Sequence, residues 1–181
     1  MTVENLGIDG LILLHPRRFS DSRGYFFETY NSVKYVELLG DHVKFVQDNV
    51  SVSKKNVLRG LHFQSPPMAQ GKLVSVLQGK VIDVAVDLRK NSKTYGQHAA
   101  IELSSENGRQ FWIPKGFAHG FAALEENTIF SYKCTELYSP QNEATIKWND
   151  PKLNIDWGLD NPIVSEKDDL GVDFTKFVSP F

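Results

Sequence analysis

Histidines within apolar segments are the residues of this sequence best suited to proton transfer. His62 stands in Arg59-Gly-Leu-His-Phe-Gln64, and His119 ends a segment of the form G-x5-P-x-G-x2-H that begins at Gly108. An imidazole exchanges protons close to neutral pH, so either histidine could act as a general base. A histidine satisfied within a core or at a sheet edge is an equally good interpretation of the first segment taken alone.

A lysine and two tyrosines could supply charge stabilisation and a proton. Lys72 precedes Leu73 and Val74, where burying its ammonium is costly without an anion or a carbonyl oxygen. A lysine that reaches solvent at a strand start is the alternative. Tyr132 and Tyr138 are six residues apart, so in a regular strand both point to one face. They could donate a proton and stack on a base, or belong to the core.

The segment that ends at His119 resembles the second signature of the cupins, small jelly-roll barrels that hold a ligand in the barrel mouth. Metal-binding cupins add ligands from a His-x-His motif followed by a Glu, but the matching stretch here reads His62-Phe63-Gln64. One or two imidazoles do not complete a coordination shell. The single cysteine, Cys134, excludes an internal disulfide and a cysteine-rich zinc site. We therefore predict no metal site.

Short β-strands must position these residues. Lys72–Gln78 and Lys80–Leu88 alternate in side-chain character around Gly79, with Asp83 and Asp87 on one face of the second run. Further strands are expected at 99–103, 110–113, 122–124, 128–137 and 144–147, with turn signals at 107–108, 114–116 and 139–140. The pattern favours a sandwich or a closed barrel, jelly rolls included.

Helices are expected to be few and short. Asn31 or Ser32 can cap one that ends before Gly40, and Ser165 can cap another. The predicted fold is a mostly β, cupin-like jelly-roll barrel with a few short helices near the termini. We expect one domain over 1–181, with the barrel core at about 45–150 and a C-terminal helical segment at about 160–181.

Composition excludes several classes of partner. The 181 residues carry 20 Lys+Arg against 22 Asp+Glu, a net charge of -2, which favours neither nucleic acid nor an anionic membrane. An anionic ligand must therefore be held by a local cluster of charges. No apolar run reaches the roughly 18 residues of a membrane span, and the first residues lack signal-peptide character. A cytoplasmic protein is the expectation.

Considered together, the segments resemble the dTDP-4-dehydrorhamnose 3,5-epimerase family. The motifs follow the family's order over most of the chain: FSDSRGYFFETYN, QDNVSVS, VLRGLHFQSPPMAQGKLV, VIDVAVDLRKNSKTYG, IPKGFAHGF, YKCTELY, WNDPKLNIDW and VSEKD. The resemblance implies conversion of dTDP-4-dehydro-6-deoxy-D-glucose to dTDP-4-dehydro-L-rhamnose by inversion of C3 and C5, without metal or organic cofactor. Both carbons flank the C4 ketone, so enolate formation acidifies their protons.

The resemblance also implies catalytic roles. His62 is expected to be the base, with Asp168 orienting its other ring nitrogen. Lys72 is expected to stabilise the enolate oxygen, and Tyr132 to be the acid on the opposite face. A capping carboxylate paired with Ser165 is the alternative for Asp168.

The substrate-binding residues are carried by the same resemblance. Asp83 and His119 are expected to pair at the pocket, and Tyr138 to stack on thymine. The full set is Arg23, Phe26, Glu28, Gln47, Asn49, Arg59, Asp83, His119, Tyr138, Glu143 and Lys167. In a regular strand Arg59 and His62 point to opposite faces, a conflict that a bulge or twist at Gly60 could resolve.

A homodimer with shared nucleotide sites, formed by exchange of an N-terminal strand, is implied by the family alone. Two other functions stay open. One is a dTDP-deoxysugar epimerase that inverts only C3 or only C5, and the other is a non-catalytic nucleotide-sugar-binding jelly roll. A binding module would need the arginines and aromatic residues but not a histidine, a lysine and a tyrosine around one carbon chain.

Overall fold

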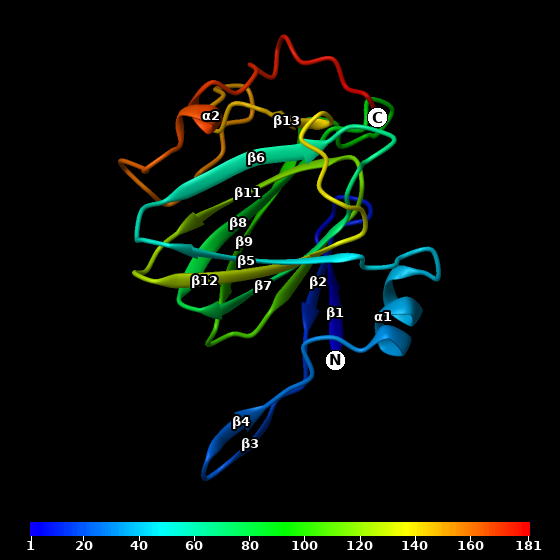
Figure 1. Ribbon diagram of the computed structural model, residues 1–181, viewed down its shortest axis with the longest axis vertical. Coiled ribbons are helices and arrows are strands. Elements are labelled where there is room, and N and C mark those ends of the chain that lie inside the picture. Colours follow the sequence, from blue (N-terminus) through cyan, green and yellow to red (C-terminus); the bar gives the residue numbers. More distant parts are fainter.

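Two antiparallel β-sheets packed face to face form the body of the protein, in a computed structural model that describes residues 1–181 (Figure 1). The six-stranded sheet has the order β1-β2-β10-β7-β12-β5, and the five-stranded sheet has the order β13-β6-β11-β8-β9. The mostly β, jelly-roll-like prediction is confirmed, with two sheets rather than one closed ladder. The first sheet contains β1 (Thr2–Asn5), β2 (Ile12–His15), β5 (Gln47–Ser53), β7 (Lys72–Gln78), β10 (Gln110–Ile113) and β12 (Thr128–Cys134); the second contains β6 (Leu58–Gln64), β8 (Lys80–Asp87), β9 (His98–Ser104), β11 (Phe117–Ala123) and β13 (Glu143–Thr145).

The main core lies between the two sheets. Val74 and Phe130 from the first sheet meet Val81 and Phe121 from the second, and the two phenylalanine rings stack with centroids 4.1 Å apart. Alternation along each strand sends every second side chain inward, so the same periodicity that fills this core can line a cavity at its end.

Short helices lie near the two ends of the chain. Helix α1 (Ser32–Leu39) starts at Asn31, whose side chain accepts hydrogen bonds from two backbone N–H groups, and it ends at Gly40. Helix α2 (Glu166–Asp169) starts at Ser165 and has only four residues. The rest of 160–181 is not helical, unlike the expected C-terminal helical segment. Neither helix has the length and apolarity needed to traverse a bilayer.

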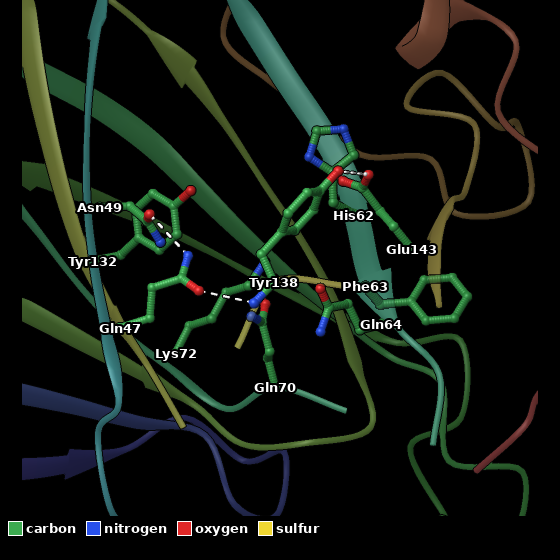
Figure 2. A pocket seen from close by; sticks show the side chains of 10 residues that line it. All are labelled: Gln47, Asn49, His62, Phe63, Gln64, Gln70, Lys72, Tyr132, Tyr138 and Glu143. Carbon is green, nitrogen blue, oxygen red and sulfur yellow. Dashed lines mark hydrogen bonds between the residues drawn. The ribbon is translucent and has the colours of Figure 1, made fainter. Parts of the chain in front are cut away.

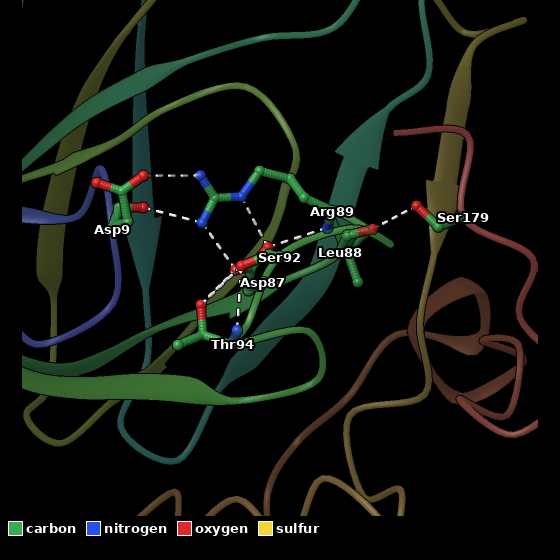
Figure 3. A network of polar contacts seen from close by, with 7 residues as sticks. All are labelled: Asp9, Asp87, Leu88, Arg89, Ser92, Thr94 and Ser179. Atoms are coloured by element: carbon green, nitrogen blue, oxygen red, sulfur yellow. Dashed lines mark hydrogen bonds and ion pairs between the residues drawn. The ribbon is translucent and has the colours of Figure 1, made fainter.

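The C-terminal tail covers the outer face of the five-stranded sheet. The rings of Phe177 and Phe181 pack edge-on against Phe63 of β6. The hydroxyl of Ser179 donates to the carbonyl of Leu88, just after β8 (Figure 3). The tail therefore packs against the outer side of β6. The residues on either side of Phe63 in this strand, His62 and Gln64, face the inside of the protein.

A buried carboxylate fixes the loop that follows β8. Asp87 has no exposed surface and accepts hydrogen bonds from Arg89, Ser92 and Thr94 (Figure 3). Burial opposes ionisation of Asp87, but these hydrogen bonds outweigh it and lower its pKa to about 2. The network is internally satisfied, which is typical of a structural role.

The N-terminal part contains strands that the sequence pattern did not predict. Strands β1 and β2 extend the first sheet, and β3 (Phe19–Asp21) pairs with β4 (Gly24–Phe26) in a hairpin that projects from the body (Figure 1). Strand β11 is longer than expected, and β12 ends at Cys134 rather than at residue 137. Strands of three or four residues are too short to show the alternation that reveals a half-buried strand.

Candidate active site

Two adjoining cavities open between the sheets and share His62, Lys72, Tyr132 and Glu143. The first cavity, about 230 Å³, is shown in Figure 2, and the second is about 300 Å³. The first is also lined by Gln47, Asn49, Phe63, Gln64, Gln70 and Tyr138; the second is also lined by Ser51, Arg59, His119, Phe121, Phe130, Ser165, Lys167 and Asp168. Polar and titratable groups dominate both linings.

His62 forms a short contact with a buried carboxylate. Its Nε2 lies 2.5 Å from Oδ1 of Asp168, while the other carboxylate oxygen accepts from the N–H of Gly60 at 3.3 Å. Burial opposes ionisation of Asp168, but the contact with His62 outweighs it and lowers the pKa of the carboxyl. The N–H of Asp168 binds the hydroxyl of Ser165, so the backbone takes part in the helix cap while the carboxylate orients the imidazole. Nδ1 of His62 has no partner in the protein and is free to accept a proton.

A bulge in β6 brings Arg59 and His62 to the same cavity. His62 pairs with His119 and Arg59 pairs with Phe121, so two residues of β6 face one residue of β11. Gly60 has φ +138°, and a Cβ there would lie 2.5 Å from the Cα of the residue opposite. Of the bulge and the twist that the sequence left open at Gly60, the structure has the bulge, and it resolves the conflict of side-chain direction.

Lys72 and Tyr132 enter the cavities from the six-stranded sheet, opposite His62. Burial lowers the pKa of the Lys72 ammonium, partly opposed by Cys134, Asp83 and other acidic neighbours. Neither the ammonium nor the Tyr132 hydroxyl has a hydrogen-bond partner in the protein, so both are available to a ligand. Burial raises the pKa of Tyr132, which keeps the phenol protonated at neutral pH.

Asp83 and His119 form a second carboxylate–imidazole pair, as the sequence resemblance implied. Nε2 of His119 lies 2.9 and 3.1 Å from the two carboxylate oxygens, and both residues are buried. Burial lowers the pKa of His119, and the Asp83 charge only partly opposes it. No group of three or more His, Cys, Asp or Glu side chains is placed to hold a metal ion.

Tyr138 lies at the mouth of the first cavity (Figure 2). Its hydroxyl donates to Oε2 of Glu143 at 2.8 Å, and the Lys167 ammonium lies 2.5 Å from the same oxygen. Burial of Glu143 opposes ionisation, but these two hydrogen bonds outweigh it and lower its pKa. Since β12 ends at Cys134, the predicted single-strand geometry for Tyr132 and Tyr138 is wrong, although both reach the cavity.

Gln47 and Asn49 share the inward face of β5. Nε2 of Gln47 donates to Oδ1 of Asn49 at 3.0 Å, and its Oε1 accepts from the N–H of Tyr138 at 2.8 Å (Figure 2). These amides are therefore placed in the cavity as the sequence resemblance implied, but they are partly occupied by each other and by the loop.

Four of the residues expected to bind substrate do not line either cavity. One of them, Asp83, lies behind His119, which lines the second cavity. The other three are in the N-terminal part of the chain. Arg23 and Phe26 belong to the projecting hairpin, where Arg23 pairs with Asp21 at 2.6 Å. Glu28 pairs with Lys34 beside α1. Within one chain, the structure does not bring Arg23, Phe26 or Glu28 to the site.

Several cavity residues were not selected from the sequence. Ser51 and Gln70 are examples, together with Gln64, which the sequence analysis considered only as a missing metal ligand. Alternation could have found Ser51, because it follows Gln47 and Asn49 at a spacing of two. Its buried hydroxyl has no partner in the protein.

Comparisons with known proteins show the family of this chain. The family profile described as dTDP-4-dehydrorhamnose 3,5-epimerase matches residues 5–176. A curated dTDP-4-dehydrorhamnose 3,5-epimerase of Salmonella typhimurium is 53% identical over 169 residues, covering 93% of this chain and 92% of that protein. The crystal structure of a dTDP-6-deoxy-D-glucose-3,5-epimerase from Legionella pneumophila, in complex with dTDP-4-keto-L-rhamnose, gives a TM-score of 0.94 at 49% identity and covers 98% of this chain and 94% of that one.

A more distant similarity is to a 3′-monoepimerase from Streptomyces bikiniensis, solved in complex with dTDP-quinovose. It is 29% identical with a TM-score of 0.88, covering 94% of this chain and 86% of that one. The profile match, and identities of 53% and 49% to 3,5-epimerases against 29% to the monoepimerase, group the chain with the 3,5-epimerases. This chain belongs to the dTDP-4-dehydrorhamnose 3,5-epimerase family.

Proposed function

We propose that this chain inverts C3 and C5 of dTDP-4-dehydro-6-deoxy-D-glucose to give dTDP-4-dehydro-L-rhamnose. The observation that carries the proposal is the placement of His62 and Tyr132 on opposing sheets across one cavity, with Lys72 on the same sheet as Tyr132. Inversion needs a base on one face of the sugar and an acid on the other. The position of the two residues on facing sheets supports these roles.

His62 is the base in this proposal. With Nε2 donating to Asp168, Nδ1 removes the proton at C3 or C5, and the carboxylate stabilises the imidazolium that forms. The electrons of the broken C–H bond form a double bond to C4, and charge moves onto the C4 oxygen. Asp168 is buried and needs no reorganisation as this charge develops.

Lys72 stabilises the resulting enolate oxygen, and Tyr132 completes the inversion. A buried ammonium with no protein partner favours a developing oxyanion, an effect of about 2.7–4 kcal/mol per donor in comparable sites. The enolate then collapses as the phenol of Tyr132 delivers its proton to the opposite face. Two rounds, one at each carbon, convert substrate to product.

The nucleotide binds at the first cavity, with Tyr138 stacked on thymine and Gln47 and Asn49 along the same wall. Arg59 lies at the second cavity and its fork suits a diphosphate. Arg23 and Phe26 complete this nucleotide site from a second copy of the chain. The projecting hairpin supports such a homodimer, since its residue Phe26 is 70% exposed in one chain.

Incubation with dTDP-4-keto-6-deoxyglucose in D2O, with deuterium mapped by NMR, tests the function. Label at both C3 and C5 of an L-configured product is expected. Exchange confined to one carbon after long incubation would assign the chain as a mono-epimerase. Binding without any exchange would make it a carrier of the nucleotide sugar.

A further inference from the structure

The loop that carries Tyr138 is irregular, so its backbone groups need partners outside a sheet. Strand β12 stops at Cys134, and the following residues leave the ladder. The carbonyl of Glu136 accepts from the side chain of Gln70 at 2.8 Å, and the N–H of Tyr138 donates to Gln47 at 2.8 Å. Glutamine side chains thus replace strand neighbours along this loop.

Gln64 makes the largest share of these contacts. Its Oε1 accepts from the N–H of Ser139 at 2.8 Å, and its Nε2 donates to the carbonyl of Leu137 at 3.1 Å, so one amide binds the backbone on both sides of Tyr138. The same Nε2 donates to the carbonyl of Met68 at 2.6 Å. Gln64 is only 4% exposed, which makes each of these bonds hard to replace by water.

The position of Gln64 in the sequence is one where metal-binding cupins have a metal ligand. It occupies the place of the second histidine in the His-x-His motif of metal-binding cupins, two residues after His62 on the same strand. A glutamine amide offers a donor and an acceptor in a fixed geometry, which matches a backbone N–H and a backbone carbonyl. In Figure 2, Gln64 lies next to Tyr138 on one side and Gln47 lies on the other side.

We propose that Gln64 is a positioning residue for nucleotide binding, which holds the backbone of the Tyr138 loop so that the aromatic ring is presented to the thymine base. The proposal rests on the nucleotide site proposed above. Gln64 acts on affinity for the nucleotide and not on proton transfer, because none of its hydrogen bonds involves His62, Lys72 or Tyr132.

A double-mutant cycle between Gln64→Met and Tyr138→Ala tests the proposal. Methionine keeps the side-chain volume but loses the three hydrogen bonds. Alone, Gln64→Met is expected to weaken dTDP binding, and to raise KM, by about tenfold, with kcat changed by less than about threefold. In the Tyr138→Ala background the same change is expected to alter dTDP affinity by less than about twofold, since there is no ring left to present.

Controls separate this role from general loss of structure. Gln78, the last residue of β7, also donates to a loop carbonyl, that of Asn127, but lies outside both cavities. Gln78→Leu is therefore expected to leave dTDP affinity unchanged. If Gln64→Met does not fold, Gln64→Asn keeps a buried amide that is too short for both contacts, and enters the same cycle. Equal losses of affinity with and without Tyr138 would overturn the proposal, as would a fall in kcat with dTDP binding intact. Wild-type epimerisation, measured in parallel, tests the proposed function separately.

Discussion

Replacing Asp168 by asparagine is the most direct test of how the site sets the base. In the proposed mechanism the carboxylate of Asp168, 2.5 Å from Nε2 of His62, accepts the Nε2 proton and leaves Nδ1 to act as the base. In Asp168→Asn, an amide NH2 in place of Oδ1 donates to Nε2 and moves the ring proton to Nδ1. That tautomer cannot accept a proton from the sugar.

The alternative amide orientation is also unfavourable. Turning the asparagine oxygen toward His62 places its NH2 against the N–H of Gly60, which now donates to Asp168 at 3.3 Å. Two donors then face each other in a site where residue 168 is 3% exposed, and leaving such groups unpaired costs about 1–3 kcal/mol. Either orientation also removes the charge that stabilises the imidazolium. We expect proton exchange to fall by about 10²–10⁴-fold, the usual contribution of general base catalysis.

The assay is deuterium incorporation at C3 and C5 in D2O, measured by NMR together with thermal melting and dTDP affinity. Asp169→Asn is the matched control, because it removes the same charge from the next residue of α2 without touching His62. If folded Asp168→Asn keeps more than about a tenth of wild-type exchange while binding dTDP normally, Asp168 does not set the tautomer.

Further predictions address the acid, the dimer, the metal and the stability. With Tyr132→Phe, exchange of ring protons is expected to continue while inverted product falls by about 10²–10⁴-fold; equal falls in both would remove Tyr132 as a dedicated acid. Arg23→Ala and His62→Ala chains, each inactive, are expected to recover activity when mixed after mild unfolding, because a hybrid dimer contains one intact site; no recovery under conditions that reassociate the wild type contradicts shared sites. Activity is expected to survive exhaustive chelation, and its loss and rescue by one divalent ion would refute this. The lowered pKa of Asp87, about 2 against 3.8, corresponds to roughly 2 kcal/mol that is present above about pH 4 and lost as pH falls toward 2. The difference in unfolding free energy between wild type and Asp87→Asn is therefore expected to shrink over that range in urea titrations, and a constant difference would contradict the assignment.

Local pattern determined much of this protein. Alternation predicted strands β7 and β8 nearly to the residue, and the capping preference of Asn31 and Ser165 located both helices. These features depend on neighbours close in sequence, so a single chain reveals them. The motifs around His62 and His119, together with the remaining segments, also identified the family before any coordinates.

Tertiary structure decided how those residues meet. Gly60 alone indicated a possible bulge, but only the ladder between β6 and β11 shows that two residues face one and turn Arg59 and His62 to one cavity. The hydrogen bond from Tyr138 to Gln47 likewise depends on a loop that leaves its strand, and alternation says nothing beyond the end of a strand.

The same reason explains what the sequence analysis missed. Gln64 was considered only as an absent metal ligand, whereas its amide binds Leu137 and Ser139, more than 70 residues further along the chain. The hairpin of Arg23 and Phe26 extends away from the pocket of its own chain, so their expected part in substrate binding stays a prediction that depends on a second copy. A hydrogen-bond partner distant in sequence leaves no periodic trace near either residue. The sequence therefore determined which groups are present and which way each strand faces, while packing of the two sheets determined which groups share a cavity.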